Sequence, residues 1–161
     1  MMIHKLITFM TFFAVILSGC STPSPVTTPT LTTVEATPVV TSDTGAVKVT
    51  LISSYTQKPL AISQIACGEM IPLKGATVSA FIPKYNSSTA PSGTSDSSGT
   101  VVISGIKPGK YALIYLYPVA NGMPALIKLP GSDNEISFDI VAGKVIDLGT
   151  LTVSIDPNQM H

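Results

Sequence analysis

Residues 94–118, TSDSSGTVVISGIKPGKYALIYLYP, place two apolar segments between turn signatures, and this stretch decides the fold. An Asp side chain at position 96 can accept hydrogen bonds from backbone N–H groups two residues on, and Gly99 tolerates a positive φ at the exit of the turn. The β-branched residues 101–103 favour a strand immediately afterwards. The sequence therefore predicts a tight turn that leads into a strand.

A second turn follows at Pro108 and Gly109, where proline pre-sets φ near the turn value and glycine supplies a left-handed residue. Residues 111–117 form a continuous apolar run, with no polar residue at every second position. This pattern is typical of a central strand that is covered on both faces. Pro118 cannot donate to a ladder and ends that strand. We therefore predict a central hairpin over residues 94–118.

The rest of the chain beyond residue 44 shows strand periodicity and no sustained helical period. Further strands are expected at residues 46–52, 60–66, 75–82, 125–129, 135–142 and 144–154. Between them we expect an irregular segment at 68–75 and a long polar loop at 83–98. In the last strand the apolar phase slips at Gly149, where a β-bulge would return the later apolar residues to the core. About seven strands with turns every eight to twelve residues predict a single all-β sandwich, Ig-like or transthyretin-like.

Residues 94–111 resemble a pattern found in carboxypeptidase-regulatory-like and collagen-adhesin B-type domains, which are transthyretin-like (prealbumin-like) β-sandwiches. The resemblance rests on Asp96, Gly99, the Pro108-Gly109 pair and Tyr111, and it covers residues 45–155 when the opening strand at 75–78 and the closing strand around Gly149 are included. Two departures from the pattern are Ser95, inserted before the aspartate, and Thr100, which replaces the usual aromatic. The resemblance implies a transthyretin-like sandwich with these residues as fold-motif turns, and we expect the sandwich to be non-enzymatic.

The N-terminus has the layout of a secretory signal: a positive start, an apolar run at 6–17 and small residues after it. That run is shorter than the about 20 residues that a transmembrane helix needs. Leu17-Ser18-Gly19-Cys20 resembles the lipobox of bacterial lipoproteins. The resemblance implies cleavage before Cys20, a diacylglycerol thioether on its sulfur and an acylated new N-terminus. The alternatives are an ordinary signal peptide with a chance cysteine, or a short membrane anchor.

The expected domain layout follows from these signals. Residues 1–19 are the lipoprotein signal peptide, 20–44 a Thr- and Pro-rich disordered linker, 45–155 the sandwich, and 156–161 a C-terminal tail. The linker carries almost no charge, and its prolines exclude a regular helix. We expect it to hold the domain away from a cell membrane or outer membrane on the extracytoplasmic side.

Composition argues against several function classes. The net charge is +0, 11% of residues are charged and arginine is absent, which argues against nucleic acid as a partner. The two histidines are His4, in the signal, and His161, the last residue, so a histidine-dependent triad or metal site within the domain is not expected. We expect no cofactor, no metal site and no catalytic residue.

Four weaker readings stay open. Cys67 is either a small buried residue or an exposed thiol that pairs between chains. Residues 133–135 with Asp96 could ligate Ca²⁺, although a solvated turn is favoured. Some collagen-adhesin B-type domains, which this sequence resembles, form an intramolecular isopeptide bond between a Lys and an Asn or Asp, promoted by a buried Glu. That resemblance makes Lys48 and Asp147 the candidates here. We expect the bond to be absent, because residues 110–118, where the family's Glu usually lies, contain no glutamate. The tyrosines form either core and rim or a sugar-stacking face: Tyr55, Tyr85, Tyr115 and Tyr117.

The sequence therefore predicts a lipid-anchored envelope protein that presents a structural or adhesive sandwich. Its expected partners are the membrane, through the lipid, and an envelope polysaccharide or surface protein. The alternatives are a carbohydrate-binding module and a small-ligand carrier resembling transthyretin.

Overall fold

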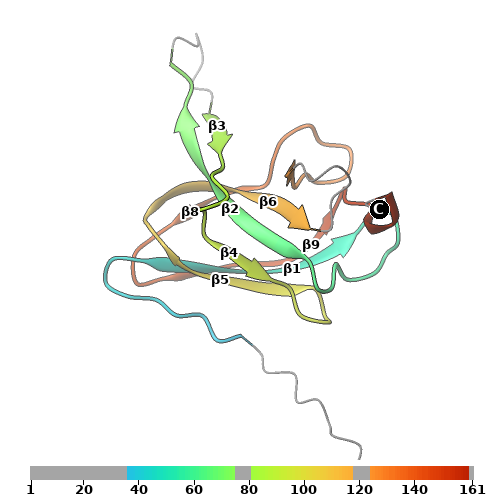
Figure 1. Cartoon of the computed structure of the whole chain (residues 1–161), viewed down its shortest axis with the longest axis horizontal. Helices are drawn as coiled ribbons and strands as arrows, with labels where there is room; N and C mark the ends of the chain where they lie inside the picture. Colours follow the sequence, from blue (N-terminus) through green and yellow to red (C-terminus); the bar gives the residue numbers. More distant parts are fainter. Residues whose placement is uncertain (1–35, 75–80, 118–123, 160–161) are drawn as a thin grey trace, which may run out of the picture. The chain divides into compact units, whose positions relative to one another are not determined.

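The structure, a computed structural model, describes residues 36–74, 81–117 and 124–159. These residues form two β-sheets and end in a single turn of 3-10 helix, Pro157–Gln159 (Figure 1). The strands are β1 (Gly45–Ser53), β2 (Gln64–Pro72), β3 (Phe81–Lys84), β4 (Ser92–Thr94), β5 (Thr100–Ile106), β6 (Gly109–Tyr117), β7 (Ala125–Leu126), β8 (Ser137–Ile140) and β9 (Val145–Val153).

The first sheet has the order β5-β1-β9, with β5 antiparallel and β9 parallel to β1. The second has the order β3-β2-β6-β7, and β4 pairs with β2 while β8 pairs with β6. Apolar side chains from both sheets form one buried cluster between them. The predicted all-β sandwich is confirmed.

The two central strands show why each lies inside the fold. In β1, Val47, Val49 and Leu51 are buried and alternate with the half-buried Lys48 and Thr50, as the alternating sequence predicts. In β6, residues 111–115 are buried without interruption, so side chains on both faces of the strand are covered, and the strand has neighbours along both edges: β2 on one side, β8 and β7 on the other. The predicted central strand is confirmed.

The predicted hairpin between β5 and β6 is wrong. β5 pairs with β1 in the first sheet, whereas β6 pairs with β2, β7 and β8 in the second. The turn at residues 107–109 therefore carries the chain from one sheet to the other. Both strands still point apolar residues into the shared core, so their sequence pattern is the same as in a hairpin.

The predictions for residues 60–75 also need correction. A strand was expected at 60–66 and an irregular segment at 68–75, but β2 runs from Gln64 to Pro72. Residues 65–68 are all buried, so the sequence there has no alternation to mark a strand. Gly68 lies directly beside Ile114 of β6, where an added Cβ would come within 2.5 Å of the Ile114 side chain.

The segment after β2 differs from the prediction as well. Most of the strand expected at 75–82 lies outside the described residues, and Ile82, expected to point inward, is 44% exposed on β3. The polar loop expected at 83–98 contains the end of β3 and all of β4. β7 is shorter than the strand expected at 125–129, although Ile127 beyond it is fully buried.

Two polar features fix the turn that leads into β5. The Asp96 carboxylate accepts hydrogen bonds from the N–H groups of Ser98 (2.8 Å) and Thr100 (2.9 Å), and Gly99 has a φ of 79°, as the turn signature predicts. Ser95, the inserted residue, is buried. Its hydroxyl donates to the Leu60 carbonyl and accepts from the Ser63 N–H (2.9 Å), so it joins this turn to the segment before β2.

The segment just before β1 contacts the sandwich. The Val39 N–H donates to the Ser104 hydroxyl of β5 (3.0 Å), and the Thr41 N–H donates to the Thr44 carbonyl (3.2 Å). Ordered contacts therefore begin before residue 45, within the part of the chain expected to be linker. The residues before 36, including the remainder of that linker, lie outside the described residues.

The bulge predicted in the closing strand is present. Lys48 pairs with Asp147 and Thr50 with Thr150, so β9 has one residue more than β1 between these pairs. Gly149 occupies that place with a φ of 66°, and its N–H donates to the Asp147 carboxylate (2.8 Å). The bulge brings both apolar pairs of β9 against the same core: Ile146 and Leu148, then Leu151 and Val153.

Gly149→Val should destabilise the domain by roughly 1–3 kcal/mol, because a β-branched residue is strained at positive φ. An added Cβ would meet no atom within 4 Å, so the effect isolates backbone conformation from packing. Thr150→Val, at an exposed neighbouring position, should change the free energy of unfolding by less than about 0.5 kcal/mol. Urea denaturation of both variants measures the difference, and equal midpoints would contradict the strained bulge.

Candidate functional site

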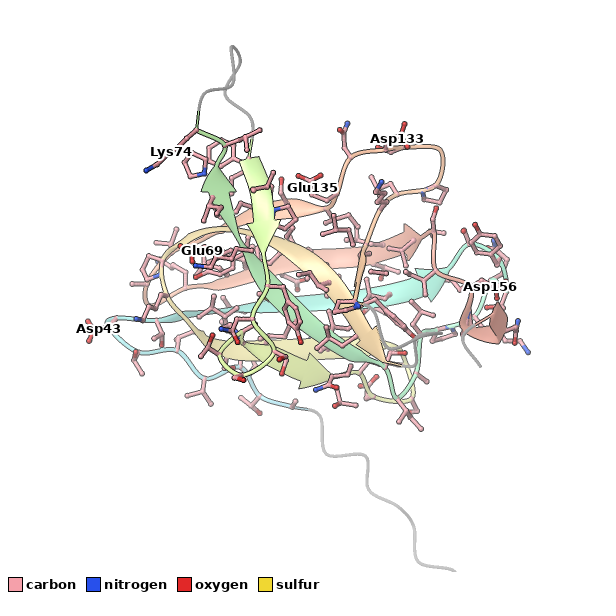
Figure 2. The ribbon with its side chains drawn as sticks, turned by 45° about the horizontal axis from the view of Figure 1, so that its top comes forward. Asp43, Glu69, Lys74, Asp133, Glu135 and Asp156 are labelled. Carbon is pink, nitrogen blue, oxygen red and sulfur yellow. The ribbon has the colours of Figure 1, made fainter. Side chains whose placement is uncertain are left out.

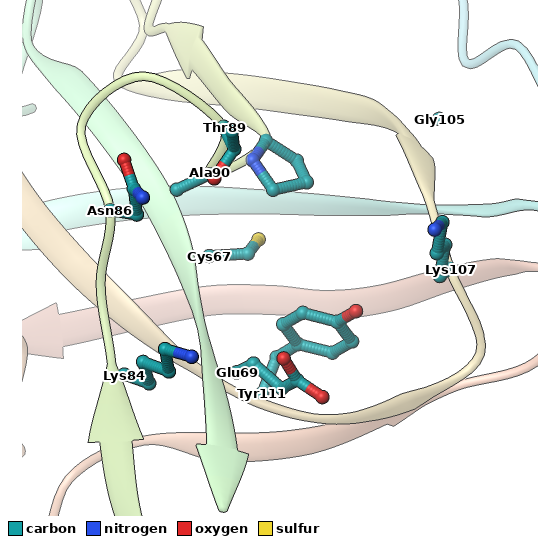
Figure 3. Close-up of a pocket in the computed structure, with 10 residues that line it drawn as sticks. Cys67, Glu69, Lys84, Asn86, Thr89, Ala90, Gly105, Lys107 and Tyr111 are labelled. Atoms are coloured by element: carbon teal, nitrogen blue, oxygen red, sulfur yellow. The ribbon is translucent and has the colours of Figure 1, made fainter.

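A polar pocket of about 350 Å³ opens beside β2, and it is the candidate functional site (Figure 3). Its walls come from β2, β3, the β3–β4 loop, the end of β5 with the following turn, and the start of β6. Its volume lies within the range of about 300–1,000 Å³ that small-molecule sites occupy. The residues that line it are Cys67, Glu69, Lys84, Asn86, Thr89, Ala90, Pro91, Gly105, Lys107 and Tyr111.

The pocket exists because the β3–β4 loop leaves the edge of β2 and then returns to it. β3 pairs with residues 69–72 of β2 and β4 pairs with residues 64–66, which leaves the middle of the strand without a neighbouring strand on that side. The Cys67 N–H donates to the Pro91 carbonyl (2.9 Å), which fastens the returning end of the loop. The loop between these two attachments arches over the edge and encloses the space.

Asn86 shapes the outer wall of the pocket. Its side-chain carbonyl accepts from the Ser88 N–H (2.9 Å), while its backbone carbonyl accepts from the N–H groups of Thr89 (3.1 Å) and Ala90 (2.8 Å). The side-chain amide group is not used in this turn, so its two N–H donors are available to a ligand. Figure 3 shows the Asn86 and Thr89 side chains together on this wall.

The charged groups come from three separate elements. Glu69 of β2 is the cross-strand partner of Lys84 of β3 on one side and of Tyr111 of β6 on the other, so these side chains share one face of the sheet. Lys107, from the turn after β5, lies across the pocket from Lys84 (Figure 3). Among the described residues, neither lysine makes an ion pair or hydrogen bond with Glu69, so the pocket has one uncompensated positive charge.

The floor is made by two buried residues of the core. Cys67 is 1% exposed, and burial raises the pKa of its thiol from 9.0 to about 12. The Tyr111 ring stacks on Phe138 with ring centroids 6.5 Å apart. Burial, followed by the nearby Glu69 carboxylate, raises the pKa of the Tyr111 hydroxyl, which makes no hydrogen bond to another described residue. At neutral pH the floor therefore offers a protonated thiol and a neutral phenol.

The Cys67 thiol is not suited to act as a nucleophile in this pocket. A nucleophilic cysteine needs a thiolate and a neighbouring base, whereas burial keeps Cys67 protonated. Within the described residues there is no group of three His, Cys, Asp or Glu side chains placed to hold a metal ion. The pocket instead presents ammonium, carboxylate, hydroxyl and amide groups around a partly apolar floor.

A second surface feature lies beyond the pocket, at the end of the β2–β3 hairpin (Figure 1). Leu73 is 46% exposed, Phe81 41% and Ile82 44%, and we call these three residues the apolar ribbon. Successive residues of a strand point to opposite faces, so Phe81 and Ile82 expose apolar surface on both sides of the hairpin. Figure 2 shows Lys74 near the outer end of the hairpin and Glu69 nearer its base.

The structure places the predicted site residues at separate points of the fold. The lipobox and its lipid-attachment site, residues 17–20 with Cys20, lie outside the described residues. Asp96 and Gly99 form the turn before β5, and Pro108 and Gly109 lie in the connection between the sheets. Tyr111 alone of the fold-motif residues lines the pocket, and Gly149 is at the β9 bulge.

The readings that stayed open have clear outcomes for four residues. Cys67 is buried and unpaired among the described residues, as the first reading proposed. Tyr115 is fully buried and hydrogen-bonds the Ser63 hydroxyl (3.1 Å), whereas Tyr55 is largely exposed and Tyr85 half-buried, so these three do not form one stacking face. The Tyr117 side chain lies outside the described residues.

Two pairings from the sequence can also be located. Asp96 is not grouped with residues 133–135, so the alternative Ca²⁺ site is not formed by the described residues. Lys48 and Asp147 are cross-strand partners in the parallel β1–β9 pair, so the two candidates for an isopeptide bond do lie side by side. Asp147 is exposed and accepts from the Gly149 N–H. The absence of the bond stays a prediction, which an intact-mass measurement tests through the loss of one water.

Most pocket residues were missed by sequence reasoning. Cys67 and Glu69 are two residues apart on β2, so they lie on the same face of the strand, and an exposed carboxylate that follows a buried residue at this spacing is the signal that could have marked the pocket. That signal is visible only if residue 69 is assigned to a strand. It was missed because residues 68–75 were expected to be irregular. Lys84 and Lys107 come from segments that are far apart in the sequence. The pairing of β2 with β3 places Lys84 beside Glu69, and the pairing of β2 with β6 places the start of β6, which follows Lys107, on the other side of Glu69.

Within residues 36–74, 81–117 and 124–159, no helix has the length and hydropathy needed to cross a membrane.

Comparisons with known proteins give remote structural matches only. No protein-family model and no curated protein sequence matches the chain. The major pilin subunit of Bacillus cereus is 16% identical over 69% of this chain, with a TM-score of 0.41, and the chain covers 30% of the pilin. Klebsiella pneumoniae 5-hydroxyisourate hydrolase is 12% identical over 73% of this chain and 96% of the hydrolase, with a TM-score of 0.33. A 9R-lipoxygenase from Cyanothece is 16% identical over 77% of this chain and 20% of that protein, with a TM-score of 0.37. Because these TM-scores are below 0.5, the proposals that follow rest on this chain's own residues.

Proposed function

We propose that this chain is a lipid-anchored, non-enzymatic module of a bacterial cell envelope, with a structural or adhesive role. The anchor is supported by the apolar run followed by Leu17-Ser18-Gly19-Cys20, and the linker by its proline and threonine content. Two or more acyl chains are needed for stable attachment to a bilayer, which a lipidated and acylated Cys20 would supply. The module would face the extracytoplasmic side of a cell membrane or outer membrane.

The apolar ribbon is the observation that carries the adhesive role. Leu73, Phe81 and Ile82 expose large apolar side chains on both faces of the β2–β3 hairpin. This hairpin extends beyond the other strands of the sandwich in Figure 1. Clustered exposed apolar residues mark interaction surfaces more often than scattered ones do. The partner proposed for this surface is a protein or polysaccharide of the envelope.

Retention of the purified chain on immobilised envelope fractions tests this role. The double substitution of Phe81→Ser and Ile82→Ser should abolish most of the retention, because it removes the apolar contact while leaving the sandwich intact. A matched control replaces Val141 and Val145 with serine, since these residues are similarly exposed at another site, at the start of β9. Equal retention of the two double variants would overturn the adhesive assignment.

The pocket favours carbohydrate binding as a second candidate function. It collects amide, hydroxyl, carboxylate and ammonium groups around a partly apolar floor, which is the mixture that a sugar requires. The sequence supports the absence of catalysis in either case, because both histidines lie at the chain ends and no arginine is present. The remaining alternative is a small-ligand carrier. It would bind its ligand in the same pocket, but that ligand would not be part of an envelope polysaccharide.

A further inference from the structure

We propose that the pocket binds a carboxylate-bearing sugar, with the carboxylate between Lys84 and Lys107 and the hydroxyl groups toward Glu69, Asn86 and Tyr111. This inference deepens the carbohydrate-binding candidate, and it is independent of both the lipid anchor and the apolar ribbon.

The charge of the pocket favours an anionic ligand. Lys84 and Lys107 approach from β3 and from the turn after β5, on opposite sides of the pocket (Figure 3). Within the described residues neither makes an ion pair with Glu69, so both ammonium groups are free to bind a ligand. A carboxylate that reaches either ammonium group would gain a charge-assisted hydrogen bond, which is stronger than a neutral one, and the other lysine would add electrostatic attraction.

The remaining groups favour hydroxyls at the other end of the ligand. The Glu69 carboxylate accepts hydrogen bonds only, and the Asn86 amide group donates because its carbonyl is already engaged by the Ser88 N–H. The Tyr111 hydroxyl can do both, and it has no partner among the described residues. A simple anion would satisfy the lysines but leave Glu69 without a donor, whereas a sugar hydroxyl supplies one.

The size and floor of the pocket favour a single sugar ring. The volume of about 350 Å³ is at the lower end of the range for ligand sites, about 300–1,000 Å³. Cys67, Ala90 and Pro91 supply apolar atoms against which the C–H groups of a sugar ring can pack. The open side of the pocket leaves room for the next unit of a chain.

Isothermal titration calorimetry on the full chain in detergent tests the inference with three probes. Glucuronate combines the carboxylate with ring hydroxyls, glucose has the hydroxyls alone, and acetate has the carboxylate alone. We expect glucuronate to bind at least about tenfold more tightly than either, since one charge-assisted hydrogen bond accounts for such a factor. Equal binding of glucose or of acetate, or no binding of glucuronate, would overturn the inference.

Lysine substitutions locate the site of binding. Lys84→Gln and Lys107→Gln should each weaken glucuronate binding about tenfold and reduce its dependence on salt, because each removes one screened charge contact. Lys58→Gln removes the same charge from an exposed lysine that does not line the pocket, and it should leave binding unchanged. Unchanged thermal midpoints in all three variants would show that the fold is intact. Equal affinities of Lys58→Gln and the pocket variants would contradict the proposed site.

The outcomes separate this inference from the adhesive role. Loss of retention in the ribbon variant, together with absent glucuronate binding, would leave the adhesive role standing and overturn the sugar site alone. Glucuronate binding together with unaffected retention of the Phe81→Ser, Ile82→Ser variant would leave the sugar site standing and overturn the adhesive role.

Discussion

Gly99→Ala should destabilise the domain by about 3 kcal/mol or more, which is the largest effect that we expect from a single methyl group in this fold. Two costs add at this position. Gly99 has a φ of 79°, where a residue with a Cβ is strained. The added Cβ would also lie 2.6 Å from the Leu51 carbonyl oxygen, so the backbone there must move, and 3.0 Å from the Pro59 Cβ, which is a tight contact.

Gly149→Ala is the matched control for that substitution. Its φ of 66° is similar, but an added Cβ would meet no atom within 4 Å. It should therefore cost only the conformational strain, about 1–2 kcal/mol. Urea unfolding of both variants gives the difference in free energy. Equal costs would contradict the close approach of the turn at Gly99 to β1.

The domain should lose stability as the pH rises above 9, because Cys67 keeps its proton in the folded state and releases it when unfolded. Burial raises the pKa of the thiol from 9.0 to about 12. Between these values the folded state binds more protons than the unfolded state, so this contribution is fully present below pH 9 and is lost progressively up to about pH 12. The loss should reach about 1.4 kcal/mol at pH 10.

Cys67→Ala removes this dependence and serves as the control. Its stability should be lower at neutral pH, because a buried side chain is shortened, but it should fall less between pH 8 and pH 10 than the stability of the wild-type chain. Tyr111 and Tyr115 also cause a loss of stability from about pH 10 upward, because burial raises their pKa values from 10.0 in the folded state. Both proteins keep these tyrosines, so the difference between the two pH profiles reports Cys67 alone. Parallel pH profiles for the two proteins would mean that Cys67 is not a desolvated thiol.

Local sequence signals predicted the elements whose pattern has one physical cause. β1 and β8 have one buried face, so their alternation is visible in the sequence, and the continuous apolar run of β6 reflects burial on both faces. The phase slip at Gly149 identified a bulge because only an extra residue can bring Leu148 and Leu151 to the same core. These inferences need no knowledge of which strands are neighbours.

The missed features all depend on strand pairing. The turn at residues 107–109 has the same chemistry whether it joins neighbours in one sheet or connects two sheets, so it could not exclude a hairpin. β2 was misplaced because residues 65–68 are buried on both faces and include a glycine. The pocket depends on β2 being partnered by β3 and β4 at its two ends and not in its middle, which no local pattern reveals.

Metabolic labelling with a fatty acid is the most direct test of the central claim, that the sandwich is presented from a membrane by a lipid on Cys20. The thiol of Cys20 is the atom that would accept the lipid, and Cys67 is the other cysteine of the chain, buried in the core. We predict that the wild-type chain and Cys67→Ala carry the label, and that Cys20→Ala carries none and accumulates as the longer precursor. Label retained on Cys20→Ala would contradict the account.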